Sequence, residues 1–182
     1  MRSIAIFLLA YLLCVGAAVA DQRDPRLDPL FEKLRETQDP STAQQAEQAI
    51  WSIWLETESA AVNILMRKGI LAMQRRDFRT ALRNFDQIVD LAPDYAEGWN
   101  KRATVYYLMG AYQESLDDIV KTLDLEPRHF GALSGRGLVL TELERNEEAL
   151  EAFEDALEVN PAMPSVRLNI EALRKLLEGR RI

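Results

Sequence analysis

The chain has 182 residues, of which 48% are hydrophobic and 28% are charged, a composition typical of a globular protein that excludes an intrinsically disordered one. Its formal net charge at pH 7 is −7. Because net negative charge repels phosphate backbones and anionic headgroups at long range, nucleic acid is disfavoured as the main partner. Apolar residues recur at spacings of three and four without a sustained alternating pattern, which predicts an all-α fold.

Residues 1–20 have the pattern of a secretory signal peptide. Arg2 is the only charge, an apolar run covers residues 4–15, and Ala18 and Ala20 are the small residues typical of a cleavage site. The run is shorter than the ~20 apolar residues that a membrane-spanning helix needs. The pattern favours export and cleavage, and the alternative is an uncleaved anchor, the only contact with a membrane that we expect.

The compartment is predicted from the cysteine count. Cys14 is the only cysteine and lies inside the predicted signal peptide, so the mature chain would have no disulfide. The sequence also contains no Asn-x-Ser/Thr glycosylation site. Both features favour a bacterial periplasm over a eukaryotic secretory route.

Residues 21–61 are predicted to form a polar leader and a helical pair. A short amphipathic helix ends near Thr37, and residues 41–44 have the spacing of a capping box for a second helix that runs to about Thr57. The second helix carries Trp51 and Trp54, which are either an aromatic platform for a ligand or a cover for the first repeat. The second interpretation is favoured, since a terminal helix pair must bury its apolar face.

Residues 62–163 contain three copies of a 34-residue pattern, with boundaries at 62–95, 96–129 and 130–163. In each copy, the first helix carries a mixture of large and small apolar residues, and so does the second helix. A proline follows the second helix. The recurring residues are Leu65, Gly69, Ala72, Ala81, Phe85, Ile88 and Pro93 in the first copy, Trp99, Ala103, Tyr106, Ser115, Ile119 and Pro127 in the second, and Leu133, Gly137, Leu140, Ala149, Phe153, Ala156 and Pro161 in the third. The small residues of the first helices are expected where two helices approach closely.

This period and pattern are those of the tetratricopeptide repeat, so residues 62–163 resemble that family. The resemblance implies an α-α superhelix of three clear repeats. The pair within residues 21–61 would be a degenerate repeat, and residues 164–182 a capping helix and tail. Residues 97–104 and 127–135 are also similar to those of small exported bacterial tetratricopeptide proteins.

The resemblance also implies a binding surface, because in this family the first helices of successive repeats line a concave groove for a peptide or a partner helix. The groove residues implied for this chain are Asn63, Met66, Arg67, Ile70, Met73, Glu97, Asn100, Lys101, Thr104, Tyr107, Ser134 and Leu138. The family's clamp for the terminal carboxylate of cytosolic chaperones is absent. Its basic and amide positions are occupied here by Met66, Ile70, Lys101, Gly131 and Gly135.

Charge is distributed unevenly along the repeats. The first helix of the first copy is basic and the second helix of the third copy is acidic. Basic residues also recur at one repeat position, as Lys68, Arg102 and Arg136. One interpretation, which we favour, pairs them with acids such as Asp86, Asp117 and Asp118 on a neighbouring second helix. The other is a groove that is basic towards its N-terminal end and suited to an acidic peptide.

The sequence indicates no catalytic site. His129 is the sole histidine, at a turn between copies, where a structural role is far commoner than catalysis, and no second histidine is present to share a metal. We therefore expect a non-enzymatic interaction module with a protein or peptide partner, without cofactor, metal or nucleic acid, acting in envelope assembly or maintenance. The alternatives are a structural subunit of an envelope complex, whose groove a neighbouring subunit fills, and an accessory to a separate enzyme.

Overall fold

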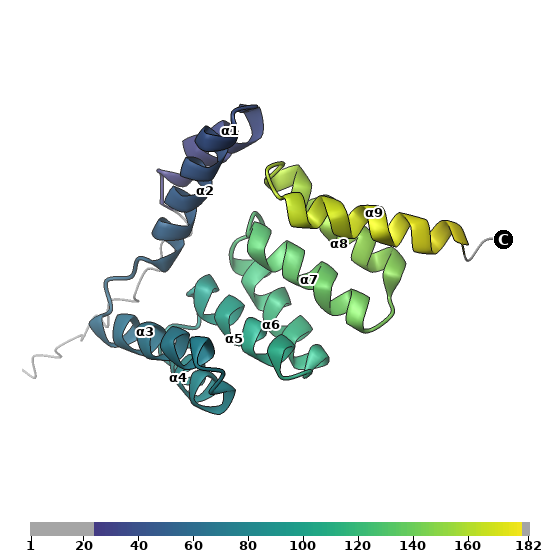
Figure 1. Ribbon diagram of the computed structural model, residues 1–182. Coiled ribbons are helices and arrows are strands. Elements are labelled where there is room, and N and C mark those ends of the chain that lie inside the picture. The colour runs from purple at the N-terminus through teal and green to yellow at the C-terminus, as the bar shows by residue number, and fades with distance from the viewer. Residues whose placement is uncertain (1–23, 180–182) are drawn as a thin grey trace, which may run out of the picture.

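The computed structural model describes residues 24–179, and this part of the chain consists of nine α-helices without a strand (Figure 1). The helices are α1 (Leu27–Glu36), α2 (Pro40–Leu55), α3 (Ala60–Gln74), α4 (Phe78–Leu91), α5 (Ala96–Leu108), α6 (Tyr112–Leu125), α7 (Phe130–Glu142), α8 (Asn146–Val159) and α9 (Pro164–Gly179). The all-α superhelix predicted from the sequence is confirmed. The predicted signal peptide lies outside the described residues.

Three antiparallel pairs, α3–α4, α5–α6 and α7–α8, follow one another, and α9 packs on α8 (Figure 1). Within each pair the size of one residue on the first helix matches that of a residue on the second. A Cβ atom on Gly69 would lie 2.6 Å from the ring of Phe85, and one on Gly137 would lie 2.5 Å from Phe153. In the middle pair, Ala103 takes the place of the glycine and the smaller Ile119 takes the place of the phenylalanine. Both are buried in one apolar cluster. The expected close approach is therefore observed.

Successive pairs are joined through one face of each first helix. Residues of this face are buried at the same repeat positions, as Gly98 and Val105 on α5, Ala132 and Val139 on α7, and Val166 and Leu173 on α9. A Cβ atom on Gly98 would lie 2.7 Å from Ile88 of α4, so the two helices are in direct contact there. α9 buries the same positions, so it packs on α8 in the way that α5 and α7 pack on the preceding second helices.

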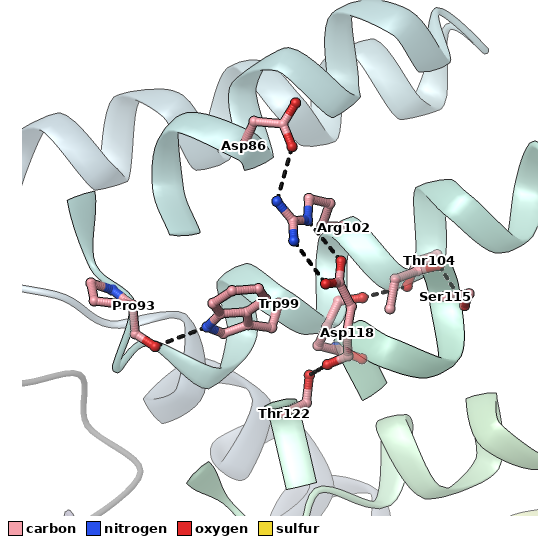
Figure 2. A network of polar contacts seen from close by, with 10 residues as sticks. Asp86, Pro93, Trp99, Arg102, Thr104, Ser115, Asp118 and Thr122 are labelled. Carbon is pink, nitrogen blue, oxygen red and sulfur yellow. Dashed lines mark hydrogen bonds and ion pairs between the residues drawn. The ribbon is translucent and has the colours of Figure 1, made fainter. Parts of the chain in front are cut away.

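Arg102 of α5 connects two pairs (Figure 2). Its Nε and Nη2 atoms donate to the two carboxylate oxygens of Asp118 on α6 at 2.7 and 2.8 Å, and Nη1 donates to Asp86 of α4 at 3.0 Å. The guanidinium also lies 4.9 Å from the ring centre of Trp99, whose indole N–H donates to the carbonyl of Pro93. Ion pairing with a neighbouring second helix is thus confirmed for Arg102. Within residues 24–179, neither Lys68 nor Arg136 forms an ion pair.

The N-terminal pair α1–α2 does not continue the stack, contrary to the expectation that it would cover the first repeat. It rises away from α3 in Figure 1 and packs on later helices, with α2 against α5 and α1 against α8. Its apolar side forms one cluster with Phe130 of α7, Val159 of α8 and Met163. The pair therefore runs along the edge of the superhelix where the first helices begin.

The start of α2 also differs from the predicted capping box. Pro40 occupies the first turn, and Asp39 is the N-cap, whose carboxylate accepts from the backbone N–H of Thr42 and from the hydroxyl of Ser41. These bonds lower the pKa of Asp39 to about 2, with the Thr42 hydroxyl contributing most. Proline suits the first turn because the N–H that it lacks has no partner within the helix.

No helix among residues 24–179 is both long enough and apolar enough to cross a membrane.

Candidate binding groove

The first helices α5 and α7 border an open depression with a volume of about 160 Å³. Residues of α6, Ser115 and Ile119, lie beneath it. The side chains that line its two walls are Asn100, Thr104, Tyr107, Ser134 and Leu138. Drug-sized ligand pockets have volumes of about 300–1,000 Å³, so this depression has room for a side chain of a longer ligand and not for a whole cofactor.

These five residues were all predicted for the groove, and the structure brings them together. The predicted residues of α3 are arranged differently. Arg67 is exposed, whereas Ile70 and Met73 are half-buried against the core of the first pair. The amide nitrogen of Asn63 donates to the carbonyl of Thr57, which holds the start of α3 to the preceding loop.

Met66 is a correction to the predicted groove. Its side chain is only 4% exposed and belongs to the core of the first pair, together with Val62 and Phe85. The predicted contact with a ligand therefore does not fit this residue, because a ligand in the groove could not reach its thioether. An unbranched apolar side chain fits either place, and the sequence pattern alone does not separate them.

Glu97 is a second correction, because its carboxylate is buried inside a polar cluster. Oε1 lies 2.6 Å from the Lys101 ammonium, and Oε2 accepts from the amide of Asn100 at 2.7 Å and lies 3.1 Å from Nε2 of His129. Burial, the largest single effect, raises the pKa of Glu97, but Lys101 and His129 together outweigh it and lower the pKa to about 2. Lys101 is thereby neutralised as a groove cation.

His129 has a structural role, at the N-cap of α7. Its Nδ1 accepts the backbone N–H of Ala132 at 3.1 Å. Since Nδ1 is an acceptor, the ring proton lies on Nε2, which donates to Glu97. The ring is completely buried, so it is not available to a substrate.

The two tryptophans of α2 cover this cluster. The Trp54 ring stacks on His129 with centroids 4.1 Å apart and an interplanar angle of 8°, and Trp51 meets the same ring edge-on at 5.4 Å. The Lys101 ammonium lies 5.2 Å from the Trp51 ring centre, a cation–π contact. The favoured interpretation, a structural cover, fits these contacts, but the repeats that are covered are the second and third.

Trp51 also reaches the wall of the depression, because a Cβ atom on Gly131 would lie 2.6 Å from its ring. The pair α1–α2 thus forms a lip along the edge where α5 and α7 begin. This role of Trp51 was not predicted from the sequence. The one available signal was Gly131 itself, a residue without a side chain at the second place of a first helix.

One exposed apolar side chain of α9 is in register with the residues of the depression. Leu168 follows Ser134 by one repeat, and its side chain is among the most exposed of the large hydrophobic residues described. Val166, Ile170 and Leu173 of the same helix are buried. Leu168 was not among the predicted groove residues, because residues 164–182 were predicted to be a capping helix and tail.

Basic residues gather at the other end of the stack. Arg67 and Lys68 of α3, and Arg75 and Arg76 in the turn after it, are exposed, and none of them forms an ion pair with another described residue. The acidic side chains of α8 are mostly exposed as well, and Glu154 pairs with Arg174 of α9. Among residues 24–179, no group of three His, Cys, Asp or Glu side chains is placed to hold a metal ion.

Comparisons with known proteins agree with this architecture. The family described as "Tetratricopeptide repeat" matches residues 66–124 and 110–164. A TPR repeat-containing protein of Rhizobium etli is 38% identical over 156 residues, which are 86% of this chain and 76% of that protein. The chain belongs to the tetratricopeptide-repeat family.

More distant relatives share part of their length with this chain. The small glutamine-rich tetratricopeptide repeat-containing protein 2 of Mycosarcoma maydis is 26% identical over 68% of this chain and 35% of its own length. The Hsp70-Hsp90 organizing protein 3 of Arabidopsis thaliana is 28% identical over 62% of this chain and 21% of its own. The matched segment is therefore less than half of either relative.

Solved structures show the same fold. The Sgt2 TPR domain from Aspergillus fumigatus superposes with a TM-score of 0.64 at 24% identity, covering 68% of this chain and 84% of that domain. The first TPR of Spaghetti, bound to the HSP90 peptide SRMEEVD, superposes with a TM-score of 0.64 at 21% identity, covering 66% and 96%. At these identities the likeness concerns the fold alone.

Proposed function

We propose that this chain is a non-enzymatic interaction module that binds an extended segment of a protein partner in the groove along α5, α7 and α9. The observation that carries the proposal is the open depression between α5 and α7, where three polar and two apolar side chains converge without filling the space. The first TPR of Spaghetti, which has the same fold, is bound to an HSP90 peptide, and this supports a peptide ligand.

The hydrogen-bonding groups in the depression favour a ligand that donates. The Thr104 hydroxyl already donates to the carbonyl of Asn100, and the Ser134 hydroxyl to that of Gly131, so each oxygen is left as an acceptor. The Asn100 amide donates to Glu97, so its own carbonyl oxygen is left to accept. Backbone N–H groups of an extended peptide fit these acceptors, and Tyr107 and Leu138 offer apolar contact to its side chains.

The partner differs from the chaperone tails seen in some neighbours. Met66 is buried, Lys101 is paired with Glu97, and Gly131 lies under Trp51, so the places of the chaperone clamp offer no cation to a terminal carboxylate. Acidic character in the partner is proposed instead towards α3, where Arg67 is exposed and forms no ion pair with the residues described.

The place of action that we propose is the bacterial periplasm, in envelope assembly or maintenance. The support is the signal-peptide pattern of residues 1–20 and the absence of cysteine from the remainder of the chain. Fractionation of cells that express the tagged full chain tests this. Recovery in the cytosol at full length would contradict it.

Site-specific photocrosslinking tests the groove. A photoreactive residue at Leu138, in the depression, should capture a defined partner in cells, whereas one at Val120, which is exposed on α6 away from the depression, should not. Leu138→Arg should reduce capture from a neighbouring probe at Thr104, because it fills the depression with a charged side chain. Equal capture from the Leu138 and Val120 positions would reject the groove as the binding surface.

The charge of the partner is tested separately. Acidic peptides should bind more tightly than basic ones at low salt, and the difference should shrink at high salt because exposed charges are screened. Indifference to peptide charge would remove the acidic partner from the proposal while leaving the groove. A stable monomer by light scattering argues against the alternative of a structural subunit with a permanently filled groove.

A further inference from the structure

One face of α3 is exposed where the corresponding faces of the later first helices are covered. Ile64 and Leu71 are 45% and 46% exposed. One and two repeats later, Val105 and Val139 take the place of Leu71, and they are 0% and 1% exposed. Gly98 and Ala132 take the place of Ile64, and both are buried. The face on α5 and α7 is buried by the second helix of the preceding pair.

The cause of this exposure is the path of α1–α2. A hairpin that continued the stack would place α2 on α3, as α4 lies on α5, but the hairpin packs instead on α5, α7 and α8. The apolar face of α3 is consequently left without a partner among the described residues. Exposed apolar residues that are grouped on one helix face mark an interaction surface more often than isolated ones do. In the later repeats, the same positions bind a helix.

A positive charge lies in the middle of this face. Lys68 occupies the repeat position of Arg102, and on α5 that position is where an acid of the preceding helix binds, since Asp86 of α4 accepts from Arg102 at 3.0 Å. Lys68 is exposed and forms no ion pair within residues 24–179. The contact between α4 and α5 therefore shows what such a face accepts, which is an amphipathic helix with an acid between apolar residues.

We propose that the α3 face formed by Ile64, Lys68 and Leu71 docks an amphipathic helix of a partner protein that carries an acidic residue between its apolar positions. The helix would take the place of the missing second helix at the start of the stack. A second copy of this chain is not the occupant, because α4, α6 and α8 already have their corresponding faces covered by α5, α7 and α9. The proposal does not depend on binding in the groove.

A peptide that copies α4 provides the probe. Residues 78–91 are held helical by a staple between positions 83 and 87, whose side chains are exposed in the protein, because an unrestrained helix of this length is marginal in water. Fluorescence anisotropy should show saturable binding of this peptide to the purified protein at low salt. Absence of binding at millimolar peptide would overturn the proposal.

Charge reversal then locates the peptide. Lys68→Glu in the protein should weaken binding about fivefold, the size expected for one exposed ion pair, and a peptide with Asp86→Lys should bind this variant better than it binds the native protein. Ile64→Ser and Leu71→Ser should weaken binding further. The matched control is Leu91→Ser, an exposed leucine of α4 away from this face, which should leave binding unchanged.

Two other outcomes would overturn the proposal. One is equal affinity of the peptide for the native protein and for the Lys68→Glu and Leu71→Ser variants, which would place binding elsewhere. The other is the absence of peptide binding together with binding to phosphatidylglycerol vesicles that Lys68→Glu abolishes, which would assign the face to an anionic membrane surface. Circular dichroism of each variant confirms that the exposed substitutions leave the helices intact.

Discussion

The two ends of the helical stack bury their apolar surfaces in different ways. At the C-terminal end, α9 repeats the contact that α5 and α7 make, with Val166, Ile170 and Leu173 buried against the preceding pair. At the N-terminal end, α1–α2 leaves α3 exposed and is held by aromatic rings around His129. The contact of α9 repeats that of the earlier first helices and so extends the superhelix. The aromatic contact of α1–α2 with His129 occurs once and shapes the edge of the groove.

The two ends also differ in how firmly they are attached to the rest of the stack. A cleft of about 880 Å³ separates α1, α2 and the loop between them from the start of α9. The hairpin is thus held mainly at Trp51, Trp54 and the cluster beneath them. We expect it to detach as a unit when that contact is weakened, whereas loss of α9 contacts should propagate into the last pair.

Trp54→Ala should have the largest effect on the N-terminal end. The substitution removes the stack on His129 and contacts with Phe31 and Phe130, so it should cost about 3–5 kcal/mol of the stability of this contact. Hydrogen exchange should show lost protection in α1 and α2 with α3 to α6 little changed. Uniform loss of protection in all helices would contradict the separate attachment of the hairpin.

Ile170→Ala is the corresponding change at the C-terminal end. Truncating this buried residue should cost about 2–4 kcal/mol, because it leaves a cavity between α8 and α9. Exchange should rise in α9 and α8 and leave α1–α2 less affected than Trp54→Ala does. A matched control is Leu168→Ala, whose exposed side chain should change the unfolding free energy by less than about 0.5 kcal/mol.

Glu97→Gln tests the polar cluster beneath the hairpin. The pKa of Glu97 in the folded protein lies below its ordinary value of 4.5, so the ionised carboxylate stabilises the fold above about pH 4.5, and this contribution is lost as the pH falls towards 2. The variant should lose about 2 kcal/mol at pH 7, the size of a charged hydrogen bond, and less at pH 3. Urea unfolding at both pH values measures this, and an equal loss at both would contradict the assignment.

Asp28→Asn should have the smallest effect. Asp28 of α1 accepts from Arg128 at 2.6 Å, but its side chain is mostly exposed, so the pair should contribute under about 1 kcal/mol. Thermal unfolding at low and high salt should show a small difference from the native protein that disappears with salt. A destabilisation as large as that of Trp54→Ala would mean that ion pairing, and not aromatic packing, holds the hairpin.

The repeats could be predicted in detail because their contacts are local and periodic. Gly69 contacts Phe85 within the first pair, and Gly137 contacts Phe153 within the third. The spacing from glycine to phenylalanine is the same in both pairs. The residues of α5 and α7 that line the depression follow from the same register, so Asn100, Thr104 and Ser134 were predicted correctly as neighbours. Met66 and Glu97 also follow the repeat register, but they were predicted wrongly. The register gives the face of the helix on which a residue lies and does not say which other segments cover that residue.

The helical class and the three repeats with their register follow from the sequence alone. The tertiary structure was needed to show that α1–α2 crosses to the second and third pairs, that Glu97 is buried with Lys101 and His129, and that α3 keeps an exposed face. The physical reason for this difference is how far apart along the chain the contacting residues lie. Helix pairing joins neighbours at a fixed spacing, whereas Trp54 and His129 meet through a single contact between distant segments, which no repeating pattern encodes.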